Sequence, residues 1–102
     1  MTSYKLVANI SELKPNGIQI DLDGDKILIA KLNNEIVAVS DICTHAGCFL
    51  SDGNIKENKV ECPCHAGEFN LITGEALGGP VSKPVKIYDV KIDNENIFIK
   101  SN

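Results

Sequence analysis

Two short boxes contain all the cysteine and histidine residues of the chain. The first box is Cys43–Cys48, which reads C-T-H-A-G-C, and the second is Cys62–Gly67, which reads C-P-C-H-A-G. Residues of these types that served only structural roles would not gather in two segments. The pattern therefore predicts a metal site.

The chemistry of these side chains narrows the choice of metal. Thiolates are soft donors that suit zinc and iron–sulfur clusters, while imidazole suits zinc, copper or iron. The six candidate ligands exceed the number that one tetrahedral ion accepts. Either some of them are not ligands, or the site holds more than one metal.

The spacing within and between the boxes resembles that of the Rieske family. A C-x-H pair is followed by sixteen residues and then by a C-x-x-H pair. The resemblance implies one [2Fe–2S] cluster, with two cysteines on one iron and two histidines on the other. The ligands implied in this way are Cys43, His45, Cys62 and His65.

The remaining cysteines, Cys48 and Cys64, match the positions of a loop-to-loop disulfide in the Rieske proteins of cytochrome bc complexes. The resemblance therefore implies a disulfide that braces the two boxes. The alternative is two free thiols near the cluster, which a reducing cytosol would favour. Cys48 lies in the first box and Cys64 in the second, and this symmetric placement favours the disulfide.

The resemblance continues beyond the boxes, with three departures from the respiratory members. Residues 68–80 resemble the strand, turn and proline-containing loop of soluble Rieske ferredoxins, with Pro80 in the loop. Respiratory members commonly have leucine, serine and tyrosine where this chain has Ala46, Gly67 and Phe69. The two missing hydroxyls would have favoured the reduced cluster, so we expect an intermediate potential within roughly −150 to +300 mV.

A structural zinc site with two cysteines and two histidines is the main alternative for the boxes. Zinc uses the same donors and would also stabilise a small domain. However, the C-x-H spacing is unusual for zinc knuckles, and zinc would leave the second pair of cysteines unexplained. The sequence favours the cluster.

The elements that must position these boxes are strands. Runs rich in isoleucine and valine alternate with polar residues, which is typical of β-structure, and tight-turn residues such as Asp23-Gly24 separate them. Ser11–Lys14 could form one helical turn. The expected strands are Tyr4–Ala8, Gly17–Leu22, Lys26–Leu32, Glu35–Ser40, Asn54–Lys56, Lys59–Cys62, Glu68–Leu71, Val85–Ile92 and Asn96–Lys100.

This pattern predicts an all-β fold, a small antiparallel sandwich or partly open barrel of the Rieske type. Residues 17–40 should form a three-stranded meander. The length of 102 residues suits one domain, so we expect a single Rieske domain over 1–102. Within it, residues 41–84 should form a loop-rich cluster-binding subdomain.

Composition limits the partners. The net charge is −4 and the chain has no arginine, so nucleic acid is not expected. No apolar run is long enough to span a membrane, and no signal peptide is visible. We therefore expect a soluble, cytoplasmic monomer that meets its redox partners transiently.

The predicted function is one-electron transfer, between a reductase and an oxygenase or another redox enzyme. The chain has no second metal domain, flavin site or nucleotide loop, so it should not be an enzyme by itself. The alternative function is a non-redox, Rieske-like assembly subunit or a zinc-binding module. The presence of all four ligand residues favours the electron carrier.

Overall fold

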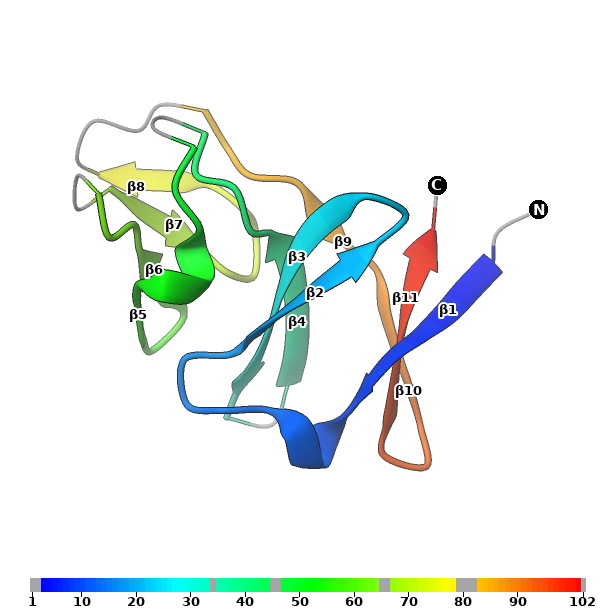
Figure 1. The fold of residues 1–102 in the computed structure, drawn as a ribbon. Coiled ribbons are helices and arrows are strands. Elements are labelled where there is room, and N and C mark those ends of the chain that lie inside the picture. Colours follow the sequence, from blue (N-terminus) through cyan, green and yellow to red (C-terminus); the bar gives the residue numbers. More distant parts are fainter. Residues whose placement is uncertain (1–2, 34, 45–46, 65–66, 79–82, 102) are drawn as a thin grey trace.

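The fold consists of three open antiparallel sheets. The computed structural model describes residues 3–33, 35–44, 47–64, 67–78 and 83–101. Figure 1 shows one sheet at each end of the molecule and the third between them. The strand orders are β1-β11-β10, β2-β3-β4-β9 and β5-β6-β7-β8. The predicted all-β class is confirmed, and the described strands do not close into a barrel.

The central sheet contains the predicted meander. Its strands are β2 (Ile18–Leu22), β3 (Asp25–Leu32), β4 (Glu35–Ser40) and the short β9 (Ile87–Tyr88). The β2–β3 hairpin turns at Asp23 and Gly24, whose φ angles are +53° and +91°, as a type I′ turn requires. Lys26 and the backbone N–H of Gly24 donate hydrogen bonds to the carboxylate of Asp21. These bonds, with that from Lys26 the larger cause, lower the pKa of Asp21 below its ordinary value.

A second sheet joins the two ends of the chain. It comprises β1 (Ser3–Asn9), β10 (Val90–Asp93) and β11 (Asn96–Ser101). The predicted single strand over residues 85–92 is two strands, because β9 pairs with β4 whereas β10 pairs with β11. The chain thus passes from one sheet to another at Asp89. The predicted helical turn after β1 is a 3₁₀ turn, η1 (Ile10–Glu12), capped by Asn9 and Glu12.

The third sheet belongs to the loop-rich region. It comprises β5 (Asn54–Lys56), β6 (Lys59–Glu61), β7 (Glu68–Asn70) and β8 (Ala76–Gly78), and a 3₁₀ turn, η2 (Leu50–Asp52), precedes it. Strand β8 was not expected from the sequence. It pairs with β7 next to an irregularity between Glu68 and Phe69.

Two hydrophobic clusters lie on opposite faces of the central sheet. On β3, Leu28 and Ala30 belong to the cluster shared with the loop-rich region, while Ile27 and Ile29 belong to the cluster shared with the β1-β11-β10 sheet. Because both faces are covered, β3 is buried on both sides. One face of the central sheet therefore packs against the hydrophobic cluster that contains Cys43 and Cys62, one cysteine from each box.

Candidate metal centre

The two boxes have the same backbone closure. In the first box, the N–H of Cys43 donates to the carbonyl of Cys48 at 2.8 Å; in the second, the N–H of Cys62 donates to the carbonyl of Gly67 at 2.6 Å. Each bond joins a residue to the one five positions later, so both boxes are six-residue loops closed at their ends. This common geometry turns two unrelated segments into a matched pair of loops.

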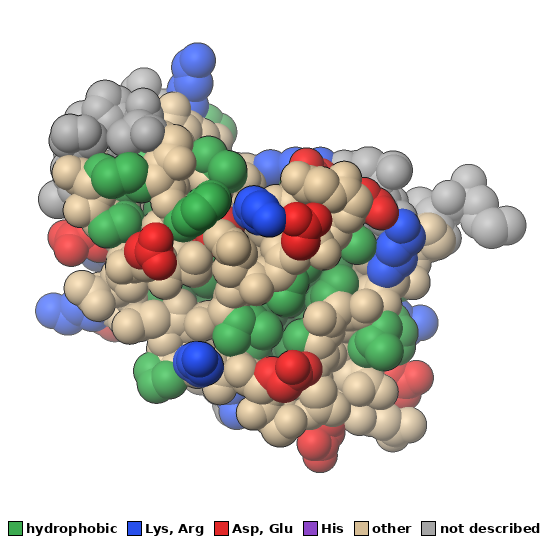
Figure 2. Space-filling view, in the orientation of Figure 1, with side chains coloured by type: hydrophobic (Ala, Val, Ile, Leu, Met, Phe, Trp, Pro, Cys, Tyr) green, Lys and Arg blue, Asp and Glu red, His purple; other side chains and the backbone are tan. Residues whose placement is uncertain are grey.

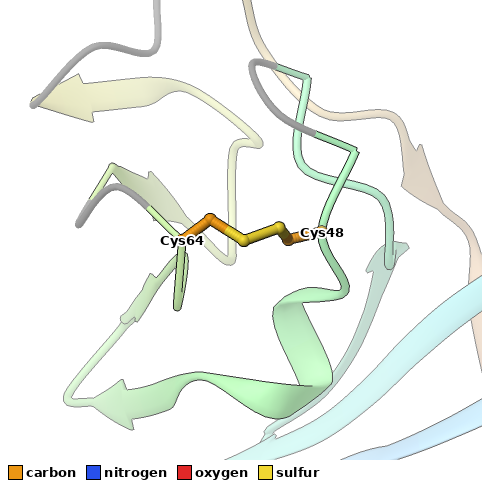
Figure 3. The surroundings of a disulfide bond; sticks show 2 residues. All are labelled: Cys48 and Cys64. Atoms are coloured by element: carbon orange, nitrogen blue, oxygen red, sulfur yellow. A yellow bond between two sulfur atoms is a disulfide. The ribbon is translucent and has the colours of Figure 1, made fainter.

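A disulfide between Cys48 and Cys64 connects the two loops, as the resemblance implied (Figure 3). Their Cα atoms are 6.4 Å apart and their sequence separation is 16 residues. A distance of this size is within the range that disulfides span. The bond fixes the spacing of the loops independently of any metal.

The other two cysteines, Cys43 and Cys62, are buried. Their exposed fractions are 2% and 1%, and both belong to the hydrophobic cluster that includes Leu50 and Phe69. A thiolate in such surroundings is costly unless a cation compensates its charge. Two buried soft donors, one from each braced loop, therefore fit an iron–sulfur cluster.

The first loop is anchored to the central sheet by Asp41, which is fully buried. Its carboxylate accepts hydrogen bonds from Gln19 Nε2 (2.6 Å), the Ser51 N–H (2.7 Å) and Ser51 Oγ (2.6 Å). Its backbone N–H donates to the carbonyl of Lys26, and its carbonyl accepts from the N–H of Leu50. Asp41 thus joins β2, β3 and η2 two residues before Cys43.

The change D41A should lower the free energy of unfolding by about 3 kcal/mol, because it removes a buried acceptor from three partly buried hydrogen bonds. Urea unfolding followed by circular dichroism would measure the loss. The matched variant S51A removes one of the three donors and should cost about 1 kcal/mol. A loss in D41A no larger than that in S51A would contradict the anchoring role.

Two further contacts hold the first loop, and the sequence did not reveal them. Thr44 Oγ1 donates to the carbonyl of Lys83 at 2.8 Å, which ties the loop to the segment leading into β9. Ile42 and Phe49 form an isolated antiparallel bridge on either side of the loop. The first contact ends on a backbone carbonyl and the second is a backbone bridge, so the type of the partner residue gives no signal in the sequence.

The second loop lies between β6 and β7. Val60 and Phe69 face each other across these strands and are fully buried. Phe69 is therefore a core residue, and Gly67 is buried at the loop's closing hydrogen bond. The packing of this hairpin fixes both ends of the box.

The structure brings together four of the predicted site residues, the four cysteines. His45, His65, Ala46 and Pro80 lie outside the described residues. Within the described ranges, no group of three or more histidine, cysteine, aspartate or glutamate side chains forms a metal site. The ligand set as a whole therefore stays a prediction.

A family model described as the Rieske [2Fe–2S] domain matches residues 3–89. The chain belongs to the Rieske family. The ferredoxin component of the naphthalene 1,2-dioxygenase/salicylate 5-hydroxylase systems of Ralstonia sp is 36% identical over 83 residues, covering 81% of this chain and 80% of that protein. The cytochrome b6-f complex iron–sulfur subunit of Chlorobaculum thiosulfatiphilum is 36% identical over 75 residues, covering 74% of this chain and 40% of that subunit.

Solved structures agree with this membership. The ferredoxin of carbazole 1,9a-dioxygenase from Nocardioides aromaticivorans IC177 superposes with a TM-score of 0.90 at 32% identity, covering 95% of this chain and 96% of that one. The protein is thus a Rieske ferredoxin with one [2Fe–2S] cluster, which supplies reversible one-electron transfer. It is an electron-carrying component of a redox system, not the component that transforms the substrate.

On the face drawn in Figure 2, lysine and acidic side chains of the described residues are interspersed. No helix in the described part of the chain is long and apolar enough to cross a membrane.

Proposed function

We propose that Cys43, His45, Cys62 and His65 bind the cluster. Three observations support this set. Each six-residue loop begins with a buried cysteine, the disulfide takes up the other two cysteines, and each loop contains one histidine. Residues 41–84 would then act as the cluster-binding subdomain of a single domain.

We further propose that the protein passes single electrons from a flavin reductase to the terminal component of an aromatic-ring oxygenase. Its ferredoxin relatives serve dioxygenase systems, and it covers most of their length. The cluster-binding loops also have an apolar border, because Ile42 and Phe49 are 40% and 37% exposed beside the first loop. An apolar border suits transient contact with a redox partner, and we place this exchange in the cytoplasm.

The one observation that carries this function is the pair of closed loops joined by the disulfide, each with a buried cysteine at its start. An anaerobic reductive titration tests it. We expect uptake of one electron per chain, reversible over repeated cycles. Mixing the reduced protein with the oxidised terminal oxygenase of the Ralstonia sp system should then return the protein to its oxidised spectrum. A protein that takes up no electron would refute the function.

A further inference from the structure

The outer face of the β5-β6-β7 sheet carries charges that are segregated by sign. Lys56 on β5 lies directly opposite Lys59 on β6. Glu61 on β6 lies directly opposite Glu68 on β7. These residues line one hollow on the surface. Like charges placed directly opposite each other destabilise a sheet, whereas opposite charges stabilise it.

No ion pair or side-chain hydrogen bond within the described residues engages the Glu61–Glu68 pair. Neither carboxylate takes part in any of the ion pairs or side-chain hydrogen bonds of that part of the chain. Across the sheet, the other neighbour of Glu61 is Asn54, and the other neighbour of Glu68 is Gly78. Neither glutamate therefore has a cationic side chain directly opposite it in the sheet.

The position of this pair relative to the cluster-binding loop is specific. Glu61 immediately precedes Cys62, and Glu68 immediately follows Gly67, whose carbonyl accepts the N–H of Cys62. The two glutamates thus occupy the two ends of the second loop, while the two lysines occupy the far end of the same face. A single exchange of Lys59 and Glu61 would have produced two opposite-charge pairs.

We propose that the Glu61–Glu68 pair lowers the reduction potential of the cluster. This inference rests on the proposed function, because it requires a cluster at Cys62. Reduction adds one negative charge to the cluster, and two fixed carboxylates at the ends of its loop oppose that charge. The effect acts on the oxidised–reduced equilibrium and requires no contact between the carboxylates and the metal.

The direct test is the charge swap K59E/E61K in the complete, cluster-loaded protein. The swap preserves the net charge of −4 and turns both like-charge pairs into opposite-charge pairs. We expect a higher reduction potential, measured by spectroelectrochemical titration, together with a higher unfolding temperature. The double variant E61Q/E68Q should also raise the potential, with the equilibrium constant for accepting an electron rising about threefold for each neutralised carboxylate.

The matched control is E57Q, which neutralises one carboxylate in the turn of the same β5–β6 hairpin, away from the second loop. It should shift the potential less than E61Q does. The shifts in E61Q/E68Q should shrink at high salt, because about 1 M salt reduces the Debye length to about 3 Å.

Two outcomes separate the possible failures. If the variants unfold at higher temperature but their potentials match that of E57Q, the pair has only a structural effect and the inference is wrong. If the parent protein contains no cluster, the proposed function itself fails. Iron and sulfide analysis of each sample distinguishes these cases. If the K59E/E61K variant binds its cluster poorly, the reduction potentials of the single variants E61Q and E68Q provide the measurement.

Discussion

Replacing Cys62 with alanine should abolish cluster binding. Cys62 is buried at the start of the second loop, and no other described residue can replace its thiolate without breaking the disulfide. Substitutions of residues that only support metal ligands cost about 10- to 100-fold in affinity, so loss of a ligand should cost more than about 100-fold. Iron and sulfide content of the purified variant, with its visible spectrum, would measure the effect.

The matched control for this experiment is the double variant C48S/C64S, which removes two cysteines from the same loops. It should retain iron and sulfide at two each per chain, because neither residue belongs to the proposed ligand set. C43A, H45A and H65A should behave like C62A. Full iron content in C62A with an unchanged spectrum would contradict the ligand assignment.

The same double variant, C48S/C64S, should have the second-largest effect, this time on stability. The disulfide closes a loop over a sequence separation of 16 residues, for which chain entropy gives about 3 kcal/mol. We expect the urea midpoint of the cluster-loaded protein to fall accordingly. Cluster release should also be faster, since the spacing of the two loops would then depend on the cluster alone.

Thiol counting provides an independent check of the disulfide. After cluster removal under denaturing conditions, the parent protein should have two alkylatable thiols, those of Cys43 and Cys62, and four after reduction. Four reactive thiols before reduction would show that Cys48 and Cys64 are not bonded. An unchanged urea midpoint in C48S/C64S would show that the bond does not brace the loops.

Local signals in the sequence predicted much of the fold. The Asp23-Gly24 turn adopts positive φ angles at both residues, and the strand Glu35–Ser40 has the predicted bounds. Strand β8 was missed because Ala76–Gly78 has no β-branched residue, and its pairing with β7 is a tertiary event. The division at Asp89 was also missed, because it too is a tertiary feature: it depends on which sheet each half of the segment joins.

For the candidate site as well, some features could be predicted from the sequence and others could not. Residue type and spacing were sufficient to nominate the cysteines and histidines, since these side chains carry the chemistry. The anchor at Asp41 could not be predicted, because its donors lie on either side of it in the chain, 22 residues before it in β2 and 10 residues after it in η2, and only the fold brings them together. The Glu61–Glu68 pair also needed the strand register, which places the two residues opposite each other.

The central claim is that this chain binds a Rieske-type [2Fe–2S] cluster, and electron paramagnetic resonance of the purified, reduced protein tests it most directly. We expect a reddish-brown protein with two irons and two sulfides per chain. Its reduced spectrum should have the low average g value of a [2Fe–2S] centre with nitrogen and sulfur ligands. A colourless protein that contains stoichiometric zinc and gives no such signal would contradict the claim.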